Sequence, residues 1–201
     1  WINRNSRYNK ENWEFDTTAK RIISWLSNHH LSYNESNEEY RSVFDYMIQK
    51  QTNHLINEIK NTKNLENKII GCSAIILSGL CYKTDKNYLN LGLNFLKKIT
   101  KYSLDNQGFT KSRSIKQQIF YFKYFILIKE WFKESQVEIP EHIEETIYYF
   151  GQAYAYFWQN TQTNLLFNGN NISNYEEFDN YLKRLGYRFR NDDKNFGGYT
   201  I

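Results

Sequence analysis

The feature that most constrains this chain is its near lack of proline, because 201 residues contain only one, Pro140. Proline inside a helix removes a backbone hydrogen bond and clashes with the preceding turn, so long helices are undisturbed where it is absent. Pro140 itself precedes a segment with helical periodicity and is placed for the first turn of a helix, where proline is tolerated. We therefore expect an all-α chain.

Apolar residues recur at helical spacing in seven segments separated by short polar stretches. The predicted helices cover residues 17–29, 36–61, 65–82, 85–103, 115–135, 141–160 and 174–185. Residues suited to N-capping stand before five of them: Asp16, Ser36, Asn64, Thr84 or Asp85, and Ser114. Gly186 follows the last segment, where a glycine commonly ends a helix.

Short connections between long helices predict antiparallel helix hairpins, which assemble into a bundle, a solenoid or a toroid. The chain shows no fixed sequence period, which disfavours a strict solenoid. Residues 187–201 have the composition of a loop followed by a beginning strand. The chain starts at Trp1 rather than at a methionine, so we expect a piece of a longer protein. The compartment, periplasm or cytoplasm, stays undecided.

Charge and cysteine content narrow the function classes. The net charge is +4 and the Lys and Arg residues are scattered, which argues against a nucleic-acid partner. The longest apolar run, 69–82, is too short to cross a membrane. Cys72 and Cys81 project about 180° apart on one predicted helix, so we expect two buried free thiols rather than a disulfide.

No cofactor or metal is predicted. The chain has no G-x-G-x-x-G, Walker or G-x-S-x-G pattern. The adjacent His29 and His30 point in different directions and have no second ligand cluster at metal-binding spacing. His54 lies on the polar side of its predicted helix, where solvent exposure is expected.

A polar turn from Asp105 to Ser114 leads directly into the helix at 115–135. Backbone N–H groups and the helix dipole favour anions at such a position. Lys111 and Arg113 are basic groups in this turn, and arginine can bind a carboxylate or sulfate through two hydrogen bonds. Arg113 has an alternative role, because it can pair with a helix carboxylate or pack its aliphatic stem.

Aromatic residues crowd the two helices after the turn, at Phe120–Phe132 and Tyr148–Trp158. At helical spacing most of these rings are expected in the core. They are too numerous for one helix face, so some Tyr and Trp rings are expected to line a groove. Aromatic faces stack on sugar rings, which makes carbohydrate a candidate partner.

Several blocks occur in an order that resembles the heparinase II/III-like family. They are WEFDTTAKRIISWLS, NLENKIIGCSAIILSGLCY, DNQGFTKSRS, ESQVEIPEHIEE and LLFNGNN, and they extend from about Trp13 to Tyr199. The set looks closest to a bacterial branch with a GG-x-x-S-R-S/N turn and an L-F-N-G block. The resemblance implies an incomplete (α/α) toroid over residues 1–186. It also implies that residues 187–201 are the linker and first strand of a β-sandwich, the rest of which lies outside this chain.

The family's activity implies a substrate and a reaction. Its members cleave acidic, uronate-containing polysaccharides by β-elimination, in which a Tyr and a His usually act as acid and base. The resemblance therefore implies a lyase-like protein that acts on an acidic polysaccharide or oligosaccharide. A non-catalytic carbohydrate-binding module and a helical interaction module are the alternatives.

The family's site residues match this chain in part. Asn64 fits a catalytic Asn, with Leu65 in place of the following His, although the sequence favours Asn64 as the N-cap of its helix. Gln117 and Gln118 occupy the expected Tyr and His positions and cannot exchange protons as those residues do. A lyase mechanism would therefore need Tyr121 or Tyr124 as its acid or base. Substrate contacts are expected from Lys111, Ser112, Arg113 and Gln117, and we expect the chain alone to be inactive.

Overall fold

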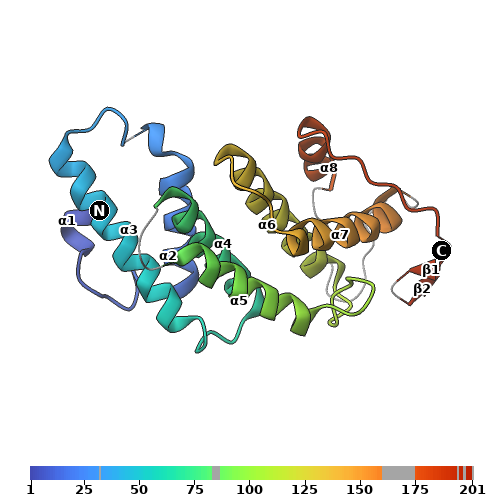
Figure 1. The fold of residues 1–201 in the computed structure, drawn as a ribbon. Helices are drawn as coiled ribbons and strands as arrows, with labels where there is room; N and C mark the ends of the chain where they lie inside the picture. Colours follow the sequence, from blue (N-terminus) through green and yellow to red (C-terminus); the bar gives the residue numbers. More distant parts are fainter. Residues whose placement is uncertain (32, 83–86, 160–174, 194, 197, 201) are drawn as a thin grey trace. The chain divides into compact units, whose positions relative to one another are not determined.

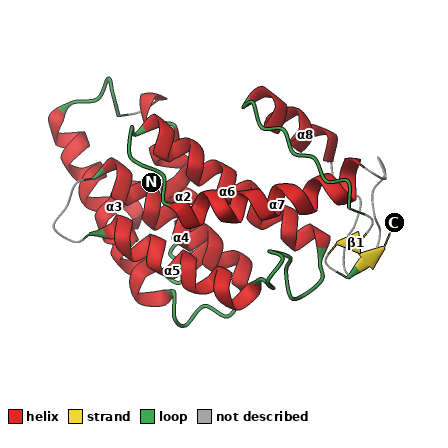
Figure 2. Cartoon of the chain, turned by 45° about the vertical axis from the view of Figure 1, so that its right-hand side comes forward, coloured by secondary structure: helices red, strands yellow, loops and turns green. Residues whose placement is uncertain are grey.

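The fold is known from a computed structural model. The structure describes residues 1–31, 33–82, 87–159, 175–193, 195–196 and 198–200. Helices make up nearly all of the regular structure (Figures 1 and 2). They are α1 (Ile2–Asn5), α2 (Phe15–Ser27), the 3-10 helix η1 (His29–Leu31), α3 (Glu38–Glu58), α4 (Leu65–Cys81), α5 (Tyr88–Ser103), α6 (Ile115–Glu134), α7 (Glu141–Gln159) and α8 (Tyr175–Arg184). This confirms the prediction of an all-α chain.

Among the described residues, the regular structure that is not helical is a short antiparallel pair of strands. β1 (Asn195–Phe196) pairs with β2 (Tyr199–Thr200), with Asn195 opposite Thr200. The pair lies in the region where the sequence indicates a beginning strand. The β-sandwich itself stays a prediction, as does the domain boundary at residue 186.

Three predicted helix ends have the expected geometry. The Asn64 side chain accepts hydrogen bonds from the backbone N–H groups of Glu66 and Asn67, at 2.8 and 3.2 Å. Ser114 Oγ accepts from the N–H of Gln117 at 3.3 Å, at the start of α6. Gly186 has a φ of 80° and follows α8, as a left-handed glycine at a helix end does.

Two predicted caps are wrong by one or two residues. The N-cap of α2 is Glu14, and Asp16 lies inside the first turn, where its carboxylate pairs with Lys20 at 2.7 Å. The N-cap of α3 is Asn37 rather than Ser36, because the Asn37 side chain accepts from the Tyr40 N–H. The predicted cap at Thr84 or Asp85 lies outside the described residues.

The chain forms two compact units. The first contains residues 1–99 and 130–138, and the second contains 100–129 and 139–201. In the first unit, α4 is the central element, since all residues from Ile69 to Ser78 are buried. It packs against α2 and α3, and these three helices lie side by side in Figures 1 and 2. The nearly all-apolar sequence of α4 explains this central position.

Two glycines allow α5 to approach α4 closely. A Cβ atom on Gly79 would overlap the backbone of Leu89, and one on Gly92 would overlap Ile76. A buried hydrogen bond of 2.9 Å between the hydroxyls of Thr52 and Ser78 links α3 to α4. The first unit therefore combines apolar packing with a satisfied polar contact in its interior.

Aromatic rings form the core of the second unit. The Phe122 ring on α6 contacts four other rings at centroid distances of 5.4 to 6.0 Å, those of Phe150, Tyr154, Phe178 and Phe189. Gly151 on α7 makes room for the Phe189 ring, which would overlap a Cβ atom at that position. The expectation that most rings of α6 and α7 are core residues is confirmed.

The two cysteines have different environments. Cys72 is buried within α4, whereas Cys81 at the end of that helix is exposed, so the prediction of two buried thiols is wrong for Cys81. The packing of α4 against its neighbours extends into its last turn through Ser78 and Gly79, but it leaves Cys81 exposed. Among the described helices, none is long and apolar enough to cross a membrane.

Candidate anion-binding turn

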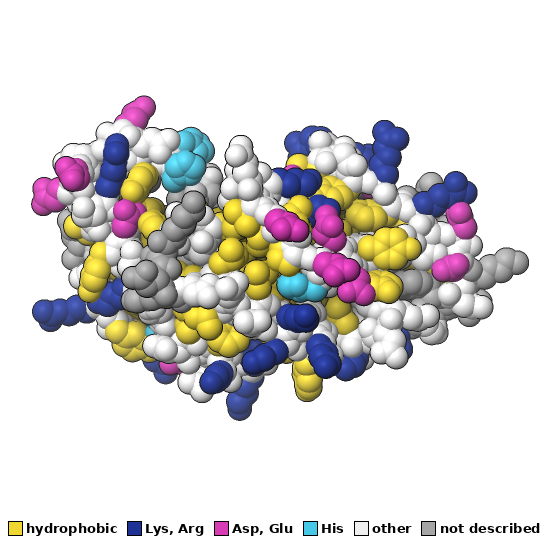
Figure 3. Space-filling model, viewed as in Figure 1, with side chains coloured by type: hydrophobic (Ala, Val, Ile, Leu, Met, Phe, Trp, Pro, Cys, Tyr) yellow, Lys and Arg dark blue, Asp and Glu magenta, His cyan; other side chains and the backbone are white. Residues whose placement is uncertain are grey.

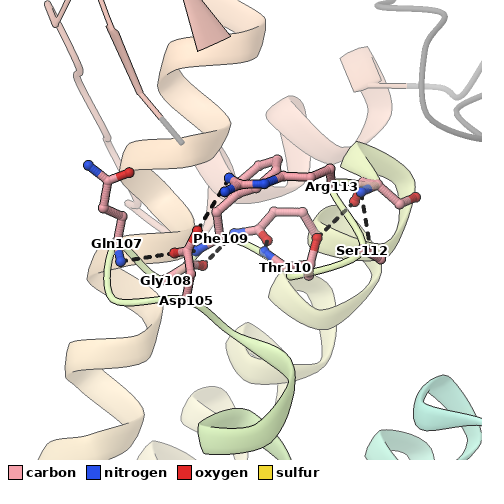
Figure 4. Close-up of polar contacts among 9 residues, drawn as sticks. Asp105, Gln107, Gly108, Phe109, Thr110, Ser112 and Arg113 are labelled. Atoms are coloured by element: carbon pink, nitrogen blue, oxygen red, sulfur yellow. Dashed lines mark hydrogen bonds and ion pairs between the residues drawn. The ribbon is translucent and has the colours of Figure 1, made fainter. Parts of the chain in front are cut away.

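The turn between α5 and α6 is shaped by the carboxylate of Asp105 (Figure 4). Asp105 Oδ1 accepts hydrogen bonds from the backbone N–H groups of Gln107 and Phe109, each at 2.9 Å. The Asp105 N–H donates to the Phe109 carbonyl at 2.8 Å, and Leu104 and Thr110 form an isolated antiparallel bridge. An aspartate that hydrogen-bonds the backbone two residues on is a common turn device.

Gly108 is required at the tip of this turn for two reasons. Its φ is 73°, in the left-handed region that favours glycine. A Cβ atom there would also overlap the Tyr149 side chain of α7. The turn is therefore held against α7 by a close contact that no larger residue allows.

Gln118 fixes the turn from inside. Its side-chain Oε1 accepts from the Thr110 N–H and its Nε2 donates to the Gly108 carbonyl, both at 2.9 Å. Only 2% of Gln118 is exposed, so both backbone groups would be left without these partners in a dry site if it were replaced. Glutamine at the position expected for a family histidine thus has a structural role here.

Arg113 has a strained backbone and a paired side chain. Its φ is 58°, which non-glycine residues adopt infrequently. Its Nη1 lies 3.3 Å from Asp105 Oδ2, and the guanidinium carbon lies 5.6 Å from the centre of the Phe109 ring. The alternative of carboxylate pairing is therefore observed, with a turn residue rather than a helix residue. The side chain is still 43% exposed and can reach a ligand.

Lys111 adds a second exposed basic group. Its backbone N–H donates to Ser103, and its Nζ donates to the Tyr102 carbonyl at 2.8 Å. Lys101, Lys116 and the Tyr102 ring are also exposed in this part of the second unit, with Tyr102 72% exposed. Lys and Arg side chains gather along the lower edge of the view in Figure 3. Lys111 and Arg113 are thus two basic groups that the turn itself presents, with Asp105 as its one carboxylate.

Ser112 and Gln117 are engaged with each other. Ser112 Oγ donates to Gln117 Oε1 at 2.7 Å and accepts from the Ser114 N–H at 3.3 Å. Ser112 is exposed and Gln117 is half-buried, so both can contact a ligand at the helix mouth. Because Gln117 Oε1 accepts this hydrogen bond, its amide N–H groups are the donors available to such a ligand.

The remaining predicted site residues make none of the hydrogen bonds described for this turn. Tyr121 is fully buried in α6, and Tyr124 is half-buried with its ring 5.0 Å from that of Phe120. Asn64 belongs to the first unit, where its side chain caps α4 as described above. The LLFNGNN block, residues 165–171, lies outside the described residues.

Sequence reasoning missed Asp105 and Gln118, which build the turn. The Asp-Asn-Gln-Gly sequence is a signal for Asp105, because an aspartate three residues before a glycine is typical of such turns. No local pattern indicates Gln118, since its partners are ten and eight residues earlier. Within the described residues, no group of three His, Cys, Asp or Glu side chains is placed to hold a metal ion.

Comparison of the chain with known protein families, with curated proteins and with solved structures finds no match. The turn geometry is therefore the basis for a functional proposal.

Proposed function

We propose that this chain is the helical part of a polysaccharide lyase-like protein and that it binds an acidic polysaccharide through the turn at Asp105–Ser114. The observation that carries the proposal is the pair of solvent-accessible cations, the exposed Lys111 and the half-buried Arg113, on a turn whose backbone is fixed by buried hydrogen bonds. A fixed turn loses little conformational entropy when a ligand binds. Exposed cations attract a chain of carboxylates or sulfates.

The same geometry favours binding over catalysis at this turn. Gln118 is buried and holds two backbone groups, so it neither reaches a substrate nor transfers a proton. Gln117 offers hydrogen-bond donors but has no titrating group. β-Elimination by the full-length protein would draw its acid and base from other residues, including those of the proposed β-sandwich. We also propose that the helices form part of the (α/α) toroid that the family resemblance implies.

A charge-matched pair of variants tests the binding site. We would measure the mobility of the chain in gels that contain alginate or heparan sulfate, at several salt concentrations. Lys111→Gln/Arg113→Gln should weaken binding by at least about tenfold, because charge-assisted hydrogen bonds are lost. The control variant Lys20→Gln/Lys133→Gln removes the same charge from the first unit. It should change the affinity for the polysaccharide by less than about twofold.

Two outcomes contradict the proposal. One is the absence of binding to any acidic polysaccharide even at low salt, where charge screening is weakest. The other is an equal loss of affinity in the two double variants, which would indicate a response to net charge alone. A separate assay of ultraviolet absorbance from unsaturated uronate products should detect no turnover by this chain.

A further inference from the structure

A second candidate site lies in the first unit, where the segment before α2 meets the C-terminal half of α3. It is a cleft of about 550 Å³, a volume within the range of ligand pockets. Its aromatic lining includes Tyr8, Trp13 and His54. Its polar lining comes from Lys10, Glu11, Glu14, Glu58, Asn61 and Thr62.

The aromatic lining is fixed at its base and open at its rim. Trp13 is 3% exposed, and its indole N–H donates to the Asn5 carbonyl at 3.1 Å. His54 Nε2 lies 2.9 Å from the Trp13 carbonyl, and the two rings meet edge to face at 5.5 Å. These contacts leave His54 half-buried, so the prediction that it is solvent-exposed is wrong.

Tyr8 completes the aromatic lining as its exposed member. Its ring centre lies 5.7 Å from that of His54 and 6.3 Å from that of Trp13, yet 66% of the residue is exposed. An exposed ring supported by two fixed rings presents a flat apolar face to the cleft at a low cost in side-chain entropy.

The charges of the lining select against an acidic ligand. Three carboxylates, from Glu11, Glu14 and Glu58, face one ammonium group, from Lys10, which gives a net charge of −2. A uronate or sulfate group would be repelled by this lining. Neutral hydroxyl groups, in contrast, donate charge-assisted hydrogen bonds to carboxylates. Asn61 and Thr62 add donors and acceptors at the same end of the cleft.

We propose that this cleft binds an uncharged sugar unit, which stacks on Tyr8 and donates hydroxyl hydrogen bonds to the glutamates. A sugar ring has an apolar C–H face and a hydroxyl edge, and the lining offers a counterpart for each. The inference does not depend on the function proposed for the turn, because the cleft is built from residues of the first unit and its ligand is uncharged, whereas the ligand of the turn is anionic.

Calorimetric titration with neutral trisaccharides of glucose and of N-acetylglucosamine tests this proposal. We expect saturable binding of at least one of them. Tyr8→Ala should weaken it by about fivefold or more, since stacking contributes on the order of 1 kcal/mol. Tyr46→Ala is the matched control, because Tyr46 is 62% exposed on α3 and does not line the cleft. It should change affinity by less than about twofold.

A second variant distinguishes a sugar from a cation. Glu58→Gln keeps a hydrogen-bond acceptor but removes one charge, so sugar binding should persist within about threefold. Lys111→Gln/Arg113→Gln, which alters only the turn, should leave it unchanged. Absence of saturable binding to the neutral trisaccharides would refute the proposal. So would an equal loss in Tyr8→Ala and Tyr46→Ala, or preferential binding of a uronate trisaccharide or of spermidine.

Discussion

Arg113 Nη1 lies 3.3 Å from Oδ2 of Asp105, so the one guanidinium of the turn is already paired within the chain. The other oxygen of the same carboxylate accepts from two backbone N–H groups and shapes the turn. Asp105 therefore has two separable roles, one in folding and one in competing with an anionic ligand for Arg113.

Asp105→Asn should separate these roles. The Asn side chain keeps an Oδ1 acceptor for the turn but no longer holds Arg113 by charge. We expect the affinity for an acidic polysaccharide to rise by about two- to fivefold, with a stability change below about 1 kcal/mol. Asp192→Asn, which removes the same charge from an exposed pair with Arg190, should have a smaller effect on binding. Weaker binding by Asp105→Asn in the gel assay would contradict this account.

The backbone of Arg113 supports a test that is independent of ligands. Because its φ is 58°, glycine should be more stable than alanine at this position, by about 1 kcal/mol. At Lys116, in the first turn of α6, the order should be reversed, because glycine is unfavourable in a helix. Urea unfolding of the four variants measures both differences. If the alanine variant were the more stable one at both positions, the turn would not impose the left-handed conformation on residue 113.

Gln118 should contribute more to stability than its neighbour Gln117. Gln118→Leu removes both side-chain hydrogen bonds to the turn and leaves the Thr110 N–H and the Gly108 carbonyl unpaired, which should cost about 2–4 kcal/mol. Gln117→Leu removes one hydrogen bond at a half-buried site and should cost about 1 kcal/mol or less. Urea midpoints at one pH compare the two variants. Similar losses would refute the structural role of Gln118.

Features encoded by local periodicity could be predicted from the sequence. The nearly all-apolar pattern of residues 69–78 indicates the buried centre of α4, and Asn64 and Gly186 mark helix ends by their own chemistry. Ser36 was misplaced as a cap because its neighbour Asn37 has that role, and Asp16 was misplaced because α2 begins one residue before it, at Phe15. In each case the error is one or two residues, since capping depends on backbone angles that residue type does not fix.

The candidate site was predictable only in its exposed residues. Lys111 and Arg113 stand out because basic residues precede a helix. Their positions, however, depend on Gln118 and on the contact of Gly108 with Tyr149, which joins residues far apart in sequence. The cleft beside Tyr8 was missed for the same reason, because α3 and the segment before α2 meet only in the folded chain.

The two cysteines should differ in reactivity. Burial raises the pKa of the Cys72 thiol well above its usual range, and α4 is packed around it. Cys81 is exposed. Titration of the native chain with a small thiol reagent should therefore modify one equivalent, and a second only after unfolding in urea. Cys81→Ser should remove the native equivalent, whereas Cys72→Ala should retain it. Rapid native modification of both thiols would contradict the buried position of α4.

Asp45 binds two tyrosines in the first unit, and these contacts should make the stability of the fold decrease at alkaline pH. It accepts hydrogen bonds from Tyr33 at 2.9 Å and from Tyr82 at 2.7 Å. Burial, the hydrogen bond to Asp45 and the negative charge of Asp45 raise the pKa of Tyr82 far above its ordinary value. The pKa of Tyr33 is raised by the same causes.

Because the folded state holds the Tyr82 proton more tightly than the unfolded state, the stabilisation is fully present below the unfolded pKa of about 10 and falls as the pH rises above it. The slope should approach about 1.4 kcal/mol per pH unit for this group. Urea midpoints between about pH 8 and 11 should therefore decrease steeply for the native chain and less steeply for Tyr82→Phe. Tyr46→Phe, an exposed control on the same helix as Asp45, should keep the native slope. An unchanged slope in Tyr82→Phe would show that this phenol does not couple folding to pH.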